Sequence, residues 1–239
     1  MSSDTDPYDH LNIALNSDGT LTRFINFPKK KANPIACNGD LVVSKDHSQC
    51  RKENSSLNLH ADHQIASQWG HNVSIIISYP FSNWYSSLWE SEINYILTSK
   101  LACQVPAIVV SVDYRVAPEN RLPAQYHDGV DAILWVREQT LNPNGEQWIK
   151  DYGDISRCYL YGHGSGGNIA FFAALEATGM ELEPLKIVGN IMNQPLFWWH
   201  CKDKLRAAKF YRPFTPLVCT RFGLGVLFAK RWKSRPLVL

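Results

Sequence analysis

The chain has 239 residues, of which 45% are hydrophobic and 19% charged, and its formal net charge is +2. This length allows one sizeable α/β domain, and this composition is ordinary for a globular protein and excludes a disordered one. No apolar run approaches the roughly 20 residues that a membrane-spanning helix needs, so we expect no membrane partner. The six cysteines lack a CxxC pair or regular spacing, and the N-terminus is polar and acidic, which together favour a cytoplasmic protein.

Charge is unevenly distributed along the chain. Residues 200–239 hold ten Lys or Arg and one acidic residue, whereas the other 199 residues hold 14 basic and 21 acidic ones. A basic tail can indicate nucleic-acid contact. No nucleic-acid-binding motif accompanies this one, so we expect no nucleic acid partner. The chain is therefore divided into a single domain, 1–199, and a basic irregular tail, 200–239.

The first hundred residues give weak signals for regular structure. Residues 7–23 predict a short helix followed by a turn and a strand. From residue 29 to about residue 70 the chain is polar and loses its periodicity, so no helix or strand is predicted there. The β-branched run 74–78 predicts a buried strand, and apolar residues at helical spacing predict a helix over 90–103.

Beyond Pro106 strands and helices alternate. The near-continuous apolar run 107–113 predicts a central parallel strand that is covered on both faces. The further predictions are a helix over 124–138, a strand over 157–161, a glycine-rich turn over 162–167, a helix over 168–177 and a strand over 185–192. This alternation predicts a mostly parallel sheet with helices on both faces.

The segment Tyr159-Leu-Tyr-Gly-His-Gly-Ser-Gly-Gly-Asn-Ile-Ala170 combines a strand, a glycine-rich turn and a helix. A phosphate-binding loop would need a lysine after the glycines, and none is present. The dinucleotide fingerprint GxGxxG matches formally, but no acidic residue ends a second strand about 20 residues on. The third interpretation is the nucleophile elbow of hydrolases, a strained turn that carries a catalytic serine. We therefore predict no cofactor.

Three stretches carry a resemblance to a known family: Asp6–Arg23, Val109–Ala124 with its motif Asp113-Tyr-Arg-Val-Ala-Pro-Glu119, and Tyr159–Gln194. They resemble the plant carboxylesterases of the hormone-sensitive-lipase-like group, over a little more than half of the chain. The resemblance implies the α/β-hydrolase fold, with the last strand–helix units of its sheet missing here. Residues 34–88 diverge from the family pattern.

The same resemblance implies roles for particular residues. In the motif after the strand at 107–113, it implies that Asp113, Arg115 and Glu119 brace the turn and do not touch substrate. It also implies an esterase that attacks small uncharged esters through a serine on the elbow.

The elbow departs from the family pattern at the nucleophile. Relatives read Gly-x-Ser-[Ser/Ala]-Gly-Gly-Asn, and Gly162, Gly166 and Gly167 match its glycines. The nucleophile position then falls on Gly164, which has no atom that can attack a carbonyl. Ser165 is the next residue and the remaining candidate nucleophile, although its backbone N–H would normally help to bind the oxyanion. His163, directly before this turn, is interpreted as structural.

The groups that would support a nucleophile are also missing from the sequence pattern. Where relatives carry a His-Gly-Gly-Gly oxyanion loop, this chain reads Ser78-Tyr-Pro-Phe-Ser-Asn-Trp84. The one histidine after Ser165 is His200, which comes too early for the triad histidine of this fold. Two hypotheses stay open: an ester hydrolase by descent with little or no activity, or a non-catalytic binder of a small hydrophobic ligand. The plant gibberellin receptors, which resemble this family, are the precedent for the second.

Four residues, His47, Cys50, His60 and His63, have a spacing that superficially resembles a zinc site, but they lie in a polar segment without predicted elements, so we predict no metal.

The tail suggests a different origin from the rest of the chain. One permitted codon choice for Leu227–Leu239, read one base later, encodes Cys-Leu-Pro-Lys-Asp-Gly-Asn-Arg-Asp-His-Trp-Tyr, and relatives carry a similar stretch in this region. The hypothesis is that residues from about His200 onward are family coding sequence read out of frame, which the coding DNA would decide.

Overall fold

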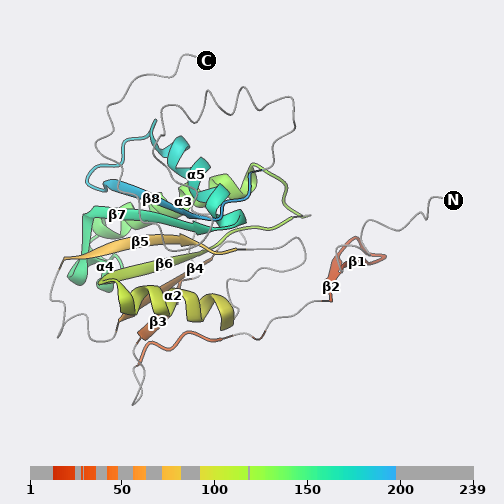
Figure 1. Cartoon of the computed structure of the whole chain (residues 1–239), viewed down its shortest axis with the longest axis horizontal. Coiled ribbons are helices and arrows are strands. Elements are labelled where there is room, and N and C mark those ends of the chain that lie inside the picture. Colours follow the sequence, from red (N-terminus) through yellow and green to blue (C-terminus); the bar gives the residue numbers. More distant parts are fainter. Residues whose placement is uncertain are drawn as a thin grey trace.

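The computed structural model describes residues 13–24, 28, 30–35, 42–47, 56–62, 72–81, 92–117 and 119–197. Within these ranges the chain forms a six-stranded sheet in the order β3-β4-β6-β5-β7-β8, together with a separate two-stranded hairpin (Figure 1). The predicted tail, and with it the boundary at residue 199, lies outside the described residues.

Four neighbouring strands of the sheet run parallel. They are β6 (Ala107–Asp113), β5 (Val73–Tyr79), β7 (Gly153–His163) and β8 (Ile187–Asn193). Each of them was predicted from its apolar run, because a strand that is covered on both faces needs apolar side chains on both. The predicted parallel sheet is therefore confirmed. The bounds of β6 are those predicted, β5 and β7 extend beyond their predicted ranges at both ends, and β8 begins two residues later and ends one residue later than predicted.

The edge of the sheet next to β6 is antiparallel and was not predicted. It consists of β3 (Val42–His47) and β4 (Ser56–Asp62), and β4 pairs antiparallel with β6, with Ser56 opposite Asp113. The sequences of both strands mix polar and apolar residues without the continuous apolar run of the central strands. β4 pairs with β6, which lies far along the chain, and β3 in turn pairs with β4. Periodicity within a strand cannot detect such pairing.

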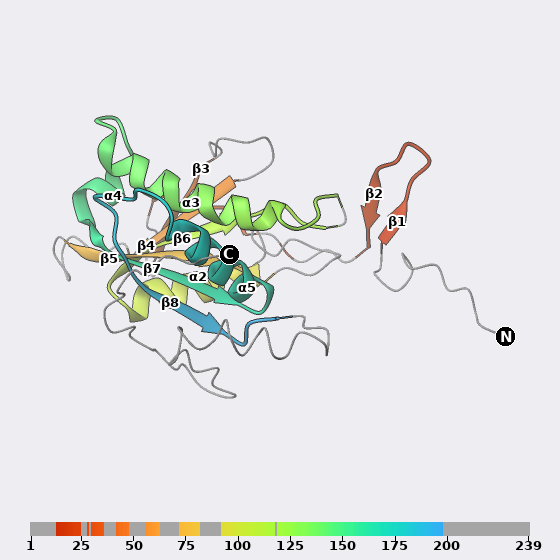
Figure 2. The ribbon, with the colours of Figure 1, turned by 90° about the horizontal axis from the view of Figure 1, so that it is seen from above.

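Helices cover both faces of the sheet (Figure 2). On one face α2 (Glu92–Gln104) packs against β4 and β6; on the other, α3 (Ala124–Leu141) and α5 (Ser165–Ala177) pack together, and α5 lies against β7 and β8. The short helix α4 (Gln147–Tyr152), which was not predicted, precedes β7.

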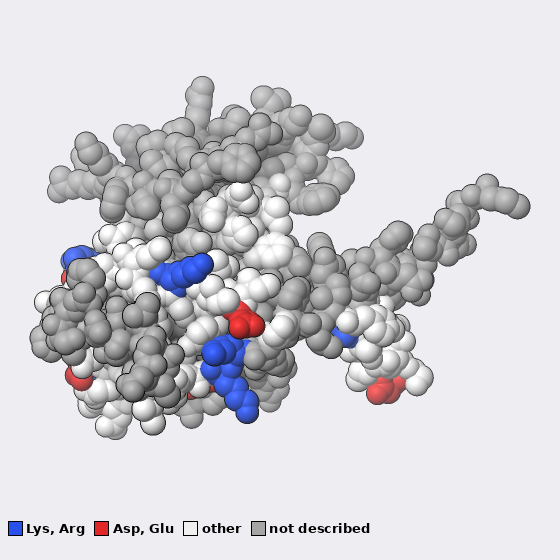
Figure 3. Space-filling model, turned by 60° about the horizontal axis from the view of Figure 1, so that its bottom comes forward, with Lys and Arg blue, Asp and Glu red and all other residues white. Residues whose placement is uncertain are grey.

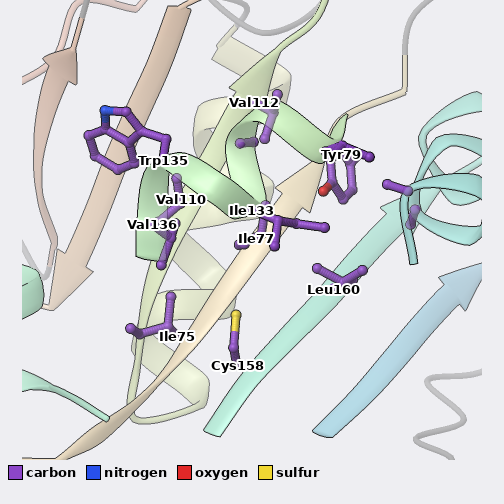
Figure 4. Packing of buried hydrophobic residues seen from close by; sticks show 14 of the residues in the cluster. Ile75, Ile77, Tyr79, Val110, Val112, Ile133, Trp135, Val136, Cys158 and Leu160 are labelled. Atoms are coloured by element: carbon purple, nitrogen blue, oxygen red, sulfur yellow. The ribbon is translucent and has the colours of Figure 1, made fainter. Parts of the chain in front are cut away.

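Alternate residues of the strands point into two different cores. The larger core contains Ile75 and Ile77 of β5, which meet Ile133 and Val136 of α3, and all four side chains are fully buried (Figure 4). Ile76, between the two β5 residues, belongs to the smaller core on the α2 side. This two-faced burial is what holds β5 and β7 rigidly, and the carboxyl ends of these strands carry the candidate site.

The prediction for the N-terminal segment was wrong at residues 13–15. They form strand β1 (Ile13–Leu15), not a helix, and pair antiparallel with β2 (Leu21–Arg23). The turn between them uses Gly19 at φ +82° and a hydrogen bond of 2.9 Å from the Thr20 N–H to the Asp18 carboxylate. A turn of this kind reverses the direction of the chain, so residues 13–15 and 21–23 lie side by side and pair as strands instead of continuing a helix. None of the helices in the described ranges has the length and apolar character to cross a membrane.

Candidate functional site: the turn between β7 and α5

The turn between β7 and α5 is a sharp corner with one residue at its apex. That residue is Gly164, with φ +58° and ψ −117°, and it lies between the last residue of β7 and the first of α5. A side chain makes positive φ costly, so this conformation favours glycine. A strained residue between a strand and a helix is the geometry of a nucleophile elbow. Gly164, rather than Ser165, thus has the backbone conformation that the elbow pattern associates with the nucleophile.

The other glycines of the turn are required by close backbone packing. A Cβ on Gly162 would lie 2.6 Å from the backbone nitrogen of Gly167, and a Cβ on Gly166 would lie 2.8 Å from the carbonyl oxygen of Pro80. Both distances are too short for any real side chain. The chain folds this tightly because β7, the turn and the first turn of α5 cross one another at the end of β5. Gly162, Gly166 and Gly167 therefore shape the corner and carry no reacting group.

The backbone of Gly164 is tied to the chain that follows β8. Its N–H donates to the carbonyl oxygen of Asn193 at 3.0 Å, and its own carbonyl oxygen accepts the N–H of Leu196 at 2.9 Å. These two hydrogen bonds hold the apex in its strained conformation through the segment that follows β8. The corner is thus fixed by tertiary contacts as well as by its own glycines.

Ser165 lies in the first turn of α5 and is partly buried. Its Oγ is 3.4 Å from the phenolic oxygen of Tyr114, and this phenol donates its single proton to the Pro80 carbonyl oxygen at 2.5 Å. In that pair the serine hydroxyl can act only as the donor to the tyrosine oxygen, because the tyrosine proton is already used. A neutral phenol is a poor base, so this contact does not activate Ser165.

An aromatic ring occupies the space beside the apex. A Cβ on Gly164 would lie 2.9 Å from Cε2 of Phe81 and closer still to Cδ2. The same ring lies 5.9 Å from the imidazole of His163, centroid to centroid, at an interplanar angle of 58°. Phe81 belongs to the segment after β5, where the family pattern has its oxyanion loop. The volume that a serine side chain would take at residue 164 is therefore filled by Phe81.

Sequence reasoning noted that 78–84 lacks the glycines of the oxyanion loop, but it did not find the role of Phe81. No local signal could reveal it, because the contact joins two segments far apart in the chain. His163 points its ring toward Phe81. Three consecutive residues discussed from the sequence, His163, Gly164 and Ser165, thus lie at this corner. The structure adds Phe81, beside His163 and Gly164, and Tyr114, beside Ser165.

The loop between β6 and α3 is held by two ion pairs. Arg115 binds the fully buried carboxylate of Asp128 through Nε at 3.0 Å and Nη2 at 2.7 Å, and its backbone N–H donates to the same carboxylate at 2.9 Å. These hydrogen bonds raise the pKa of Arg115. Arg23 of the hairpin binds Glu119 in a bidentate pair, which lowers the pKa of that carboxyl. Arg115 and Glu119 thus make bracing contacts of the kind implied, while Asp128 was not singled out.

Of the residues discussed as metal ligands or as a general base, only His47 and His60 lie in the part of the chain that the structure describes. Cys50, His63 and His200 lie outside the described residues. His47 and His60 lie on the paired strands β3 and β4, where His60 is opposite Ser44. In the part of the chain that the structure describes, no three His, Cys, Asp or Glu residues are grouped to hold a metal ion.

A family model described as the alpha/beta hydrolase fold matches residues 89–221, which is more than half of the chain. The chain belongs to the α/β-hydrolase fold family. The match includes the strand–turn–helix with Gly164 at its apex, and it continues past residue 200 into the predicted tail.

Plant relatives place this hydrolase-fold chain among the carboxylesterases. It is 40% identical over 215 residues to probable carboxylesterase 9 of Arabidopsis thaliana and covers 66% of that protein. It is 53% identical over 110 residues to a 3-O-acetylpapaveroxine carboxylesterase of Papaver somniferum and covers 35% of it. The chain thus spans one third to two thirds of the length of these relatives.

Solved structures agree on the fold. The chain superposes on a hyperthermophilic esterase from the archaeon Pyrobaculum calidifontis with a TM-score of 0.52 and 20% identity, covering 74% of this chain and 51% of that one. On an inhibited esterase B from Lactobacillus rhamnosis the TM-score is 0.53 at 17% identity, covering 73% of this chain and 55% of that one. The predicted α/β-hydrolase fold is confirmed.

Proposed function

We propose that this chain, a carboxylesterase-type hydrolase by family, hydrolyses esters poorly or not at all. The observation that supports the proposal is the apex of the elbow, where Gly164 replaces a nucleophile and Phe81 fills the adjoining volume. Acyl transfer by this fold needs an oxygen nucleophile at the apex. Backbone N–H groups can stabilise the oxyanion, but without a nucleophile to attack the ester carbonyl no oxyanion forms. The substrate class that the family resemblance favours is a small uncharged ester.

Ser165 does not take over the role of the missing nucleophile in this proposal. It lies one residue beyond the apex, in helical conformation, and its hydroxyl contacts the phenol of Tyr114. A serine needs a base that removes its proton during attack, and a phenol that is already donating to a carbonyl oxygen does not supply one.

A second candidate function is the binding of a small hydrophobic ligand without cleavage. It is favoured by the intact corner, which keeps its three packing glycines and its hydrogen bonds although the nucleophile is absent. Relatives are also named for different reactions, since a 2-hydroxyisoflavanone dehydratase of Glycyrrhiza echinata is 42% identical over 104 residues. In this alternative Phe81 and His163 would face the ligand.

Hydrolysis of p-nitrophenyl acetate by the full chain tests the first proposal. The expected rate equals that of a heat-denatured sample, and Ser165→Ala leaves it unchanged. Turnover that disappears in Ser165→Ala would contradict the proposal and identify Ser165 as the nucleophile. A ketone analogue of the ester, which cannot be hydrolysed, separates the two candidates: a saturable rise in melting temperature without turnover supports the binder, and no rise supports an inactive hydrolase.

A further inference from the structure

Helix α2 buries polar residues against the sheet and exposes apolar residues, the reverse of an ordinary surface helix. Its buried residues are Asn94, Thr98 and Ala102, at 5%, 3% and 0% exposure. Its apolar residues Ile93 and Leu97 are 48% and 56% exposed. A surface helix normally buries its apolar stripe and exposes its polar one. The side of α2 away from the sheet is therefore an apolar surface on the outside of the molecule.

The inward polar face has its own partners, so the orientation of α2 is not accidental. The side-chain amide of Asn94 donates to Ser111 Oγ of β6 at 3.1 Å, and Thr98 Oγ1 donates to the carbonyl oxygen of Asn94 at 2.8 Å. Ser111 is fully buried. The Thr98 hydrogen bond lies within α2, but rotating α2 to bury its isoleucines would break the hydrogen bond from Asn94 and leave the Ser111 hydroxyl unsatisfied in the core, at a cost of about 1–3 kcal/mol.

The outer face of α2 combines apolar and charged groups in a symmetrical order. Ile93, Ile96 and Leu97 follow the i, i+3, i+4 spacing of a single helix stripe. Glu92 lies before them and Lys100 after them, and both are exposed. Glu92 and Lys100 are each four residues from Ile96, about 6 Å along the axis at ~1.5 Å per residue. In the described part of the chain, neither has an ion-pair partner.

This order of charges is complementary to itself. When two copies of α2 pack antiparallel about a twofold axis near Ile96, Glu92 of each copy meets Lys100 of the other. A twofold interface uses the same patch on both subunits, so one patch must supply both halves of every contact. The α2 patch, defined as Glu92, Ile93, Ile96, Leu97 and Lys100, does so with an apolar centre and an opposite charge at either end.

We propose that the α2 patch is a homodimer interface, in which α2 packs antiparallel against α2 of a second copy. Figure 3 shows one face of the molecule, where the described residues are mostly uncharged and a few acidic and basic side chains lie close together. A self-association surface explains why three large aliphatic side chains face outward on one helix. The proposal does not depend on whether the chain hydrolyses esters, because α2 covers the sheet face opposite to α5.

The size of the patch limits the expected affinity. Helix α2 has 13 residues, about 20 Å in length, so one helix pair buries less than the roughly 1,600 Å² of a standard interface. We therefore expect a weak, concentration-dependent dimer rather than a permanent one. The Glu92–Lys100 pairs lie at the rim, where they select orientation more than they add affinity.

Sedimentation equilibrium of the full chain at low salt, over a hundredfold range of concentration, tests the proposal. The wild type should move from one to two chain masses, and Ile96→Glu should remain monomeric. Glu92→Lys and Lys100→Glu should each weaken the dimer about tenfold, because each change sets like charges against each other at two symmetry-related places. The double variant Glu92→Lys/Lys100→Glu should restore wild-type association, since it only exchanges the ends of the pairs.

The controls separate this interface from general stickiness. Glu176→Lys makes the same charge change at an exposed residue of α5 and should leave association unchanged. A monomeric wild type, growth beyond the dimer, an effect of Glu176→Lys equal to that of Glu92→Lys, or a double variant that stays weak would each overturn the proposal. The charge variants keep the test decisive if Ile96→Glu fails to fold, because both charged residues are on the surface.

Discussion

Gly164→Ser places a serine at the apex of the elbow, and its effect can be worked out from the structure. The substituted residue must keep φ near +58°, which costs a non-glycine residue about 1–2 kcal/mol. Its Cβ must also displace the ring of Phe81, which stands 2.9 Å away at Cε2, and overpacking of this kind costs about 1–3 kcal/mol. We expect the free energy of unfolding to fall by about 2–5 kcal/mol in total.

The two contributions can be separated by removing the ring. In a Phe81→Ala background Gly164→Ser should cost only its backbone strain, so the double-mutant cycle should show a coupling of about 1–3 kcal/mol. Urea unfolding of the four proteins measures it. Gly164→Ala is the matched control, since it adds the Cβ without the hydroxyl and should match Gly164→Ser in stability. Equal costs with and without Phe81 would refute the steric argument.

The same variant tests the chemistry of the corner. A serine hydroxyl at residue 164 without a base stays protonated and weakly nucleophilic. A fluorophosphonate probe should therefore label Gly164→Ser negligibly, also when Phe81 is replaced by alanine. Rapid stoichiometric labelling would show that a base is present at the corner. The proposal of an inactive elbow would then be supported only by the absence of a nucleophile at Gly164.

Three further predictions concern buried and paired groups. Asp128→Asn should lower the free energy of unfolding by about 2–4 kcal/mol in a urea titration, because it leaves the Arg115 cation without its buried partner; a loss below ~0.5 kcal/mol would contradict this. Burial raises the pKa of Cys158 to about 12 from 9.0, so the unfolded thiol ionises first and stability should fall as pH rises above about 9, by up to ~1.4 kcal/mol per pH unit. Cys158→Ala should show a shallower decline between pH 8 and 10.5, and identical slopes would count against it. Arg23 lowers the pKa of Glu119 from 4.5, so their pair stabilises the fold above that pH and its contribution is lost on acidification. Because the pair is partly exposed, Glu119→Gln should cost less than ~1 kcal/mol at pH 7 and should reduce the acid sensitivity; unchanged sensitivity would exclude the pair as its cause.

The parts of the fold that the sequence predicts are those whose signal is local. The apolar run 107–113 is buried on both faces, so its composition alone marks a central parallel strand. The corner at residue 164 is equally local, because a glycine cluster between a strand and a helix supplies the positive φ and the close backbone packing that a sharp turn requires. By contrast, β3 and β4 were missed, since they become strands only by pairing beside β6, and their own residues lack a strong period.

The orientation of α2 and the contact of Phe81 with the elbow were beyond the sequence for the same reason. Apolar spacing over 90–103 predicts a helix, but it does not decide which side of the helix faces the sheet. In the structure Asn94 faces the sheet, where its side-chain amide donates to the Ser111 hydroxyl of β6. The sequence by itself determined that the apex residue lacks a nucleophilic atom. Only the tertiary structure decided that Phe81 fills the space beside it. Phe81 follows β5 and Gly164 follows β7, and the pairing of these two strands brings the two residues together.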